Sequence, residues 1–492
     1  MTPESPLSIS PAPENGLRYG STAGWWVIAA AVLGSGIAFL DATVVNVALP
    51  AIQRDLGGGL AGLQWTVDAY LLTLGSLIVF GGSLGDLYGR RRGFVLGLVT
   101  FTISSGLCGI APSLGVLILG RTLQGAGGAL LVPASLSMIS ASFRPRDRGA
   151  AIGAWSGLSG VSTAIGPFLG GYLIDSVSWR LVFLINLPLA AIAIWLATTH
   201  VPETRDEQAS SRPDAAGAAT LALGVGGSVF ALIEGPTIGF TAVSVLAGAA
   251  LGLLGFILFL GIEARVSNPM LPLETFKSRQ FVGANIVTLV VYAALGGAMF
   301  LLAIHLQRSL GYSALEAGAA FLPVTILMML LSPAAGRLAG RIGPRIPMTA
   351  GPLVVAASLL LMARIEPGRG YSTSVLPAAV VLGLGLCLTV APLTAAVLAA
   401  VDDHHIGVAS GINNAIARLA ALLAIAVLPF VTGLSASTSL VHAFPNAMKL
   451  AAGASVVGAI VAFLTIDRSI SVRPAVHPDL SSGCHHALEL TG

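Results

Sequence analysis

Long apolar stretches separated by short polar breaks run through most of the chain. A helix needs about 20 mostly apolar residues to cross the hydrocarbon core of a bilayer. The apolar stretches have about this length, which predicts an all-α membrane protein. The pattern gives fourteen candidate spans, at residues 25–48, 63–82, 93–110, 114–139, 150–174, 179–199, 215–233, 243–262, 281–306, 317–336, 347–363, 374–399, 407–431 and 447–466.

The composition indicates that lipid rather than water surrounds most of the chain. Hydrophobic residues make up 55% of the 492 residues and charged residues only 10%. A soluble globular protein has roughly a quarter charged residues, so these charges are too few to cover a water-facing surface. Intrinsic disorder is excluded for the opposite reason, because it requires low hydrophobicity.

The Lys and Arg residues predict how the spans are oriented, because cytoplasmic loops are enriched in them. With a cytoplasmic N-terminus, seventeen of the 25 basic residues fall on the cytoplasmic side, six fall outside and two lie within spans. An odd number of spans would destroy this asymmetry. The first 24 residues hold no apolar stretch, so no removable signal peptide is expected. Both termini are therefore predicted to be cytoplasmic.

An internal repeat indicates two similar halves. The segment GSLGDLYGRR at Gly82–Arg91 matches GRLAGRIGPR at Gly336–Arg345 at a leucine, a glycine and an arginine. Each segment follows the second span of a six-span block, an arrangement expected of parallel repeats in a secondary transporter. The predicted organisation is a cytoplasmic tail (1–24), a six-helix bundle (25–199), a cytoplasmic linker (200–214), two extra transmembrane helices (215–262), a cytoplasmic loop (263–280), a second six-helix bundle (281–466) and a disordered cytoplasmic tail (467–492).

Four motifs carry a resemblance to a known family. They are LDATVVNVALP at Leu40–Pro50, GSLGDLYGRRR at Gly82–Arg92, LILGRTLQGAGGA at Leu117–Ala129 and STAIGPFLGG at Ser162–Gly171. With WRLVFLINLP at Trp179–Pro188, they make the chain resemble the fourteen-span drug:proton antiporter family of the major facilitator superfamily over residues 25–466. The chain departs from the family at Ser162, where glycine is usual, and in the second loop, where Gly340 stands opposite Asp86.

The resemblance implies a major facilitator fold, in which two six-helix bundles and two additional transmembrane helices make fourteen spans. It implies a secondary active transporter that exports small amphipathic or cationic compounds, such as drugs, antiseptics and dyes, in exchange for protons by alternating access. The expected setting is the bacterial cytoplasmic (inner) membrane, where the protein would act as a monomer in the lipid bilayer. Two alternatives stay open: export of an endogenous metabolite or lipid, and a membrane sensor of the same fold without transport.

The charged residues within spans are the first candidates for the chemistry. A charge at the bilayer centre costs about 2.5–3.5 kcal/mol on insertion scales, so it is rarely kept without a function. Desolvation favours the neutral form of Asp41, whereas Arg121 would favour its charged form. The resemblance implies that Asp41 and Arg121 take part in proton coupling. The alternative is a buried structural ion pair.

Asp68 lies in the second span, three residues after Trp65 and on roughly the same helical face. A carboxylate beside an aromatic ring suits an organic cation, and Asp68 is a further candidate for proton coupling. The alternative places Trp65 in an interfacial aromatic belt, with Asp68 near the outer headgroups.

A polar group in the thirteenth span is a candidate for the substrate cavity. It contains Asn413, Asn414 and Arg418, and Trp65 is assigned to the same cavity. Snorkelling of the Arg418 side chain to the cytoplasmic surface is the alternative.

Two glycine-rich motifs are candidates for conformational change. Small residues let helices approach closely, and the resemblance implies that the charged loop latches the outward-open state. The predicted latch residues are Gly82, Asp86, Gly89, Arg90 and Arg91. The resemblance also implies that the fifth span carries the antiporter motif at Gly166, Pro167, Gly170 and Gly171.

Several function classes are excluded by missing motifs. A phosphate-binding loop needs Lys after Gly, but the two lysines, Lys277 and Lys449, follow Phe276 and Met448. Neither a zinc-protease HExxH motif nor a GxSxG nucleophile elbow occurs. We therefore expect no enzyme activity, no cofactor and no metal. The net charge of +3 gives no support for nucleic-acid binding.

Overall fold

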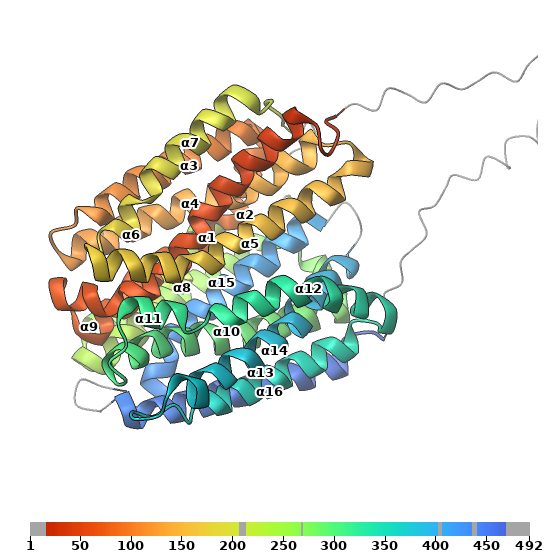
Figure 1. The fold of residues 1–492 in the computed structure, drawn as a ribbon. Coiled ribbons are helices and arrows are strands. Elements are labelled where there is room, and N and C mark those ends of the chain that lie inside the picture. The colour runs from red at the N-terminus through yellow and green to blue at the C-terminus, as the bar shows by residue number, and fades with distance from the viewer. Residues whose placement is uncertain (1–15, 206–212, 267–268, 402–405, 435–439, 469–492) are drawn as a thin grey trace, which may run out of the picture.

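The computed structural model describes residues 16–205, 213–266, 269–401, 406–434 and 440–468. Helices dominate these segments (Figure 1). The first group is α1 (Thr22–Leu56), α2 (Gly59–Tyr88), α3 (Arg90–Gly109), α4 (Leu114–Ser142), α5 (Pro145–Ser176), α6 (Leu181–Leu184) and α7 (Asn186–His200). Next come α8 (Ala215–Ile238), α9 (Val243–Glu263) and the short 3₁₀ helix η1 (Leu273–Lys277). The last group is α10 (Arg279–Arg308), α11 (Ala314–Ala319), α12 (Leu322–Ile342), α13 (Arg345–Met362), α14 (Tyr371–Ala399), α15 (Ile406–Val431) and α16 (Leu440–Thr465).

Fourteen helical segments within the described residues are long and apolar enough to cross a membrane. The pairs α6–α7 and α11–α12 each count as one such segment. The prediction of an all-α protein with fourteen spans is confirmed. Most helices are longer than the predicted spans, and α1 ends at Leu56 rather than at residue 48. Hydropathy detects only the lipid-embedded part of a helix, whereas backbone hydrogen bonding continues into the polar end turns.

The helices form two bundles that lie side by side, α1 to α7 in red to yellow and α10 to α16 in green to blue (Figure 1). The α8–α9 hairpin packs against the seam between the bundles, where α8 contacts both α2 and α15. Glycines hold the hairpin together, since a Cβ at Gly255 would lie 2.4 Å from the backbone nitrogen of Gly224. Small residues of this kind allow close packing of membrane helices.

We call the side where α1 begins and α16 ends the terminal side, and the opposite side the far side. Helices α1 and α10 run from the terminal side to the far side, and α2 and α15 run antiparallel to each other.

The two bundles meet closely on the far side. A Cβ at Gly171 of α5 would lie 2.4 Å from the carbonyl oxygen of Ala314, and one at Gly318 would lie 2.0 Å from the carbonyl oxygen of Pro167. The Asp175 carboxylate at the end of α5 accepts hydrogen bonds from two backbone amides at the start of α11, those of Ala314 (3.2 Å) and Leu315 (2.8 Å). The far side is therefore closed by helices in backbone contact.

A second seam joins α2 to α15. The Gln64 amide donates to the carbonyl oxygen of Ile425 at 2.7 Å near the far side. A Cβ at Gly75 would lie 3.0 Å from the Leu419 side chain at the middle of the helices. This seam includes glycine contacts and a side-chain-to-backbone hydrogen bond, but no salt bridge joins α2 to α15 in the described residues.

The terminal-side halves of α5 and α12 are open by contrast. A Cβ added there at any of several helix glycines would meet nothing within 4 Å, namely at Gly149, Gly153, Gly157, Gly160, Gly336 and Gly340. Among the described residues, the α5–α12 side of the two bundles is therefore closed on the far side and open on the terminal side.

This geometry predicts that Gly318→Ala opens the far side. The new methyl group would overlap the carbonyl oxygen of Pro167, and overpacking of this kind costs about 1–3 kcal/mol in the closed conformation only. The population of the far-side-open conformation should rise by roughly tenfold or more. Spin labels on Ile110→Cys and Arg369→Cys, at exposed far-side positions of the two bundles, would report a longer distance.

Gly340→Ala is the matched control, because its Cβ would lie in open space, and it should leave the distance distribution unchanged. Both variants are made with Cys484→Ser so that the tail cysteine is not labelled. Equal distance distributions in the two variants would contradict the assignment of the α5–α11 contact as the far-side gate.

Candidate functional site

An ion pair lies inside the first bundle, between α1 and α4. The Arg121 guanidinium donates to the Asp41 carboxylate at 2.5 Å. Relative exposure is 0% for Asp41 and 1% for Arg121, so water does not screen the pair. Removing one partner of such a pair leaves an uncompensated buried charge, which is strongly destabilising. The structure therefore brings together the two residues that the sequence predicted as partners.

Polar groups from other helices complete this site. Gln124, one turn after Arg121, accepts from the guanidinium at 2.7 Å and donates to the second Asp41 oxygen at 2.9 Å. Asn186, the first residue of α7, donates to Ser105 of α3 at 3.0 Å and to Asp41 at 3.5 Å. Both Asp41 oxygens therefore accept hydrogen bonds, which is what keeps a buried carboxylate tolerable.

The Arg121 guanidinium is enclosed by a backbone acceptor and an aromatic ring. Its Nε donates to the carbonyl oxygen of Thr66 at 3.0 Å. The guanidinium carbon lies 4.3 Å from the centre of the Tyr70 ring, and cations are attracted to such a ring face. Arg121 thus ties α4 to both α1 and α2.

The glycines of the fourth-span motif explain how α4 comes this close to its neighbours. A Cβ at Gly125 would lie 2.4 Å from the carbonyl oxygen of Tyr70 on α2. One at Gly127 would lie 2.7 Å from the backbone nitrogen of Phe101 on α3. Side chains at either position would push the helices apart and separate Arg121 from its partners.

Asp68, unlike Asp41, is buried without hydrogen-bond donors around it in the described residues. Its relative exposure is 0%, and neither carboxylate oxygen has a hydrogen-bond partner in the described part of the chain. Trp65 does not face the same space, because its Nε1 donates to Glu234 of α8 at 2.9 Å. The structure therefore does not bring Trp65 and Asp68 together around an open cavity.

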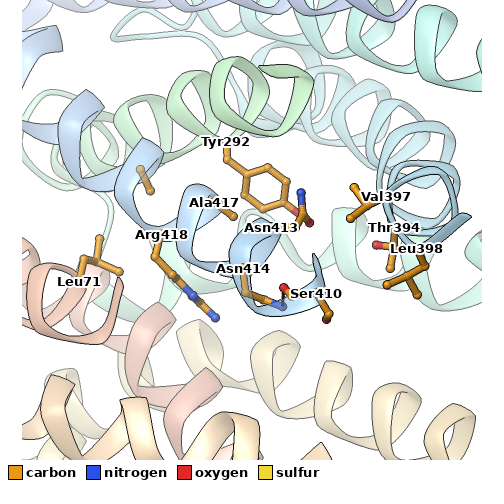
Figure 2. Close-up of a pocket in the computed structure, with 11 residues that line it drawn as sticks. Leu71, Tyr292, Thr394, Val397, Leu398, Ser410, Asn413, Asn414, Ala417 and Arg418 are labelled. Carbon is orange, nitrogen blue, oxygen red and sulfur yellow. Dashed lines mark hydrogen bonds between the residues drawn. The ribbon is translucent and has the colours of Figure 1, made fainter. Parts of the chain in front are cut away.

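A pocket of about 250 Å³ lies mainly in the terminal-side half of the second bundle, with Leu71 of α2 at its border (Figure 2). Figure 2 shows Arg418 and Asn414 extending from α15, with Tyr292 of α10 above them. The three polar residues predicted for a cavity in the thirteenth span, Asn413, Asn414 and Arg418, all line this pocket. Trp65 is not among its lining residues. The other lining residues are Thr394, Val397, Leu398, Ser410, Ala417 and Ala421.

The Arg418 side chain does not extend to the terminal surface. Arg418 lies at the middle of α15, and its guanidinium carbon is 6.0 Å from the ring centre of Phe39, which lies at the middle of α1. The head group therefore stays at mid-membrane depth and points toward the first bundle. This position disfavours the snorkelling interpretation.

The charged loop between α2 and α3 contacts its own bundle. Asp86 accepts from Arg90 at 2.8 Å, one helical turn away. Glu203, after α7, accepts from the Arg91 amide at 3.0 Å and lies 3.6 Å from its guanidinium. Gly89 ends α2 with φ of 117°, a conformation that favours glycine. No salt bridge from this loop to the second bundle occurs in the described residues.

The antiporter motif lies on α5 and contacts two other helices, α1 and α11. A Cβ at Gly170 would overlap the Val44 side chain of α1, and one at Gly166 would lie 2.4 Å from the Thr43 hydroxyl. Gly171 and the carbonyl oxygen of Pro167 face α11 in the other bundle. Gly82 of the loop motif contacts Pro133 of α4 more loosely.

Four functional candidates were missed by the sequence analysis. Gln124 and Asn186 complete the ion-pair site, Glu203 anchors the loop, and Asp175 binds the start of α11. Gln124 could have been found by its three-residue spacing from Arg121, and Asn186 by its place in the WRLVFLINLP motif. Among the described residues, no group of three or more His, Cys, Asp and Glu side chains could hold a metal ion.

Two helix bundles, a pocket lined mainly by the second bundle and a buried ion pair in the first make an arrangement typical of secondary transporters. The sequence profile described as Major Facilitator Superfamily matches residues 31–425 and again residues 284–482. The chain belongs to the major facilitator superfamily.

Proteins with similar sequences support this family assignment. The chain is 38% identical over 402 residues to "Multidrug resistance protein Stp" of Mycobacterium tuberculosis (strain CDC 1551 / Oshkosh), covering 80% of this chain and 73% of that protein. It is 33% identical over 428 residues to "Tetracenomycin C resistance and export protein" of Streptomyces glaucescens, covering 87% and 79%. These matches confirm the predicted resemblance to drug-efflux members of the superfamily.

The fold also matches a solved structure. A POT family transporter crystallised with 5-aminolevulinic acid superposes with a TM-score of 0.69, over 92% of this chain and 97% of that one. The sequence identity is only 13%, so the likeness concerns the fold alone.

The ion pair predicts that replacing both charges destabilises the protein less than replacing either one. Asp41→Asn and Arg121→Gln each leave one buried charge without its partner and should each destabilise the protein by about 3–5 kcal/mol. The double variant leaves a neutral, hydrogen-bonded network and should be more stable than either single variant. Thermal unfolding in detergent, followed by tryptophan fluorescence, measures all four proteins. If the stability lost in the double variant equals the sum of the losses in the two single variants, the two charges do not stabilise each other.

Proposed function

We propose that the protein exports small amphipathic compounds from the bacterial cell in exchange for protons, by alternating access of a pocket between the two bundles. The observation that carries this proposal is Asp68, an acid buried without a hydrogen-bond partner in the described residues. It lies on α2, which packs against α15 and borders the pocket through Leu71. The names of the relatives support resistance and export.

The terminal side is assigned to the cytoplasm. The excess of Lys and Arg in the loops on this side supports the assignment, because basic residues stay on the cytoplasmic side of a membrane. With this assignment, the pocket opens to the cytoplasm, which is the side from which an exporter binds its substrate. The proposed location is the bacterial cytoplasmic membrane, with a monomer as the working unit.

The acids in the first bundle have different roles in this proposal. Asp41 already accepts hydrogen bonds on both oxygens, so Asp41 and Arg121 form a charged pair that protonation of Asp41 would break. Asp68 has no such donors, and burial without them costs far less for a neutral carboxyl than for a carboxylate. Asp68 is therefore the proposed proton carrier in the cytoplasm-open state, and the Asp41–Arg121 pair couples its protonation to helix positions.

Substrate binding and protonation exclude each other in the proposed cycle. Asp68 lies on α2, and α2 packs against α15, which supplies several pocket residues. In the proposed cycle, loss of the Asp68 proton changes the electrostatic potential at these pocket residues. When the outer side opens, the loop between α2 and α3 would exchange its contacts within the first bundle for contacts across the cytoplasmic side. The resemblance assigns this latch to Gly82, Asp86, Gly89, Arg90 and Arg91.

The proton gradient can supply the required free energy. One proton moving inward down a potential of 100 mV provides about 2.3 kcal/mol. With one proton exchanged for one neutral substrate molecule, this supports a roughly fifty-fold export ratio, since each 1.4 kcal/mol corresponds to a factor of ten. A pH gradient would add to this ratio.

Asp68→Asn should separate exchange from proton coupling. The amide keeps the size of the carboxyl but cannot release a proton, so downhill exchange of substrate should continue while uphill transport falls by roughly tenfold or more. Purified protein in liposomes with an internal pH dye measures substrate accumulation and proton movement together.

Glu234→Gln is the control, because Glu234 is also an acid near α2 but can still accept from Trp65 as an amide. It should retain uphill transport. Full uphill transport by Asp68→Asn would remove Asp68 from the proton pathway. Loss of downhill exchange in the same variant would indicate a role in substrate binding instead.

A further inference from the structure

The pocket has an unbalanced positive charge. Of the residues that line it, Arg418 alone is charged; the remainder are neutral. Asp41 and Asp68, the acids predicted to lie within the spans of the first bundle, are both fully buried and do not line it. A substrate entering this conformation therefore meets a cation.

The Arg418 guanidinium is available for a ligand. No hydrogen bond or ion pair joins it to another described residue, and its one aromatic contact is the Phe39 ring at 6.0 Å. A cation–π contact at that distance leaves the guanidinium donors unused. A charge held at mid-membrane without a counter-charge is costly, which favours a role in binding.

The groups around Arg418 suit an amphipathic molecule. Ser410, Asn414 and Arg418 follow each other at four-residue intervals and so form one stripe along α15 (Figure 2). Asn414 is exposed, and its amide nitrogen, which donates to the Ser410 carbonyl oxygen at 3.1 Å, has a second N–H to offer a polar ligand group. Apolar side chains stand at opposite ends of the pocket, with Leu71 at one end and Val397 and Leu398 at the other (Figure 2).

We propose that this pocket selects amphipathic organic anions, with a carboxylate, sulfonate or phenolate bound by Arg418 and an apolar or aromatic body held by Leu71, Tyr292 and Leu398. The planar guanidinium can donate two parallel hydrogen bonds to such a group. This inference rests on the proposed export function and narrows its substrate class from amphipathic compounds in general to anions.

The charge of the substrate determines how the membrane potential acts on transport. Exchange of one proton for one exported anion moves two charges in the same sense, whereas exchange for a neutral molecule moves one. Exchange for a monovalent cation moves none. An anion exporter would thus gain the most from a negative interior.

The test uses three probes with the same fluorescent body and different charges: dansylglycine (anionic), dansylamide (neutral) and dansylcholine (cationic). Their binding to the purified full-length protein in lipid nanodiscs is followed by fluorescence. Dansylglycine should bind most tightly. Arg418→Gln should lower the ratio of dansylglycine affinity to dansylamide affinity by about tenfold, the size expected for losing a charge-assisted hydrogen bond.

Arg418→Lys keeps the charge but not the pair of parallel donors, so it should keep a ratio between those of the wild type and Arg418→Gln. Retained binding in this variant would show that the pocket is still folded. Arg337→Gln is the charge-matched control, since Arg337 is exposed on α12 and lines a different pocket, and its ratio should equal that of the wild type. Tighter binding of dansylcholine than of dansylglycine, an unchanged ratio in Arg418→Gln, or no binding of any probe would overturn the proposal.

Uphill movement of the same probes in liposomes separates this proposal from the proposed function. Proton-driven transport of dansylcholine alone would keep the export function and overturn the anion assignment. Binding of dansylglycine through Arg418, with no probe driven uphill by a pH gradient, would support the anion site and overturn proton-coupled export.

Discussion

Arg121 of α4 is a full positive charge buried inside a helix bundle. Such a charge is stable only if the surrounding helices supply a counter-charge and hydrogen-bond acceptors. Its guanidinium binds the Asp41 carboxylate of α1, the Gln124 side chain of its own helix and the Thr66 carbonyl oxygen of α2. Asn186 of α7 reaches the same carboxylate. Because a shift of any of these helices would expose an unpaired charge or polar group, α1, α2, α4 and α7 are constrained to move together.

In the proposed cycle, motion takes place at the two seams between the bundles. Glycines, backbone groups and the Asp175 carboxylate form the α5–α11 contact on the far side, around Gly171 and Gly318. Two side chains without a hydrogen-bond partner among the described residues, Asp68 on α2 and Arg418 on α15, belong to the helices of the second seam. In the proposed function, the paired charges of Asp41 and Arg121 hold their helices together, whereas Asp68 and Arg418 lie where a proton and a substrate can change the balance between conformations.

The sequence predicted the spans and the Asp41–Arg121 pair because apolar length and a rare intramembrane charge are strong local signals. It did not predict Asp175 or Glu203, because an acid near a helix end looks like any solvated residue until its partner from a distant segment is known. Trp65 and Asp68 were expected on one face, but three residues leave side chains about 60° apart on a helix. That angle is enough to turn Trp65 toward α8 and to separate it from Asp68.

Proton coupling is tested most directly by the steady-state accumulation in liposomes of dansylglycine, the probe expected to bind most tightly. The accumulation is measured against imposed pH differences with the membrane potential held at zero. If each transported molecule is exchanged for one proton, the logarithm of the accumulation ratio rises by about one for each pH unit, because one pH unit is worth about 1.36 kcal/mol per proton. An accumulation ratio that stays at one across all pH differences, while downhill exchange continues, would contradict proton-coupled export.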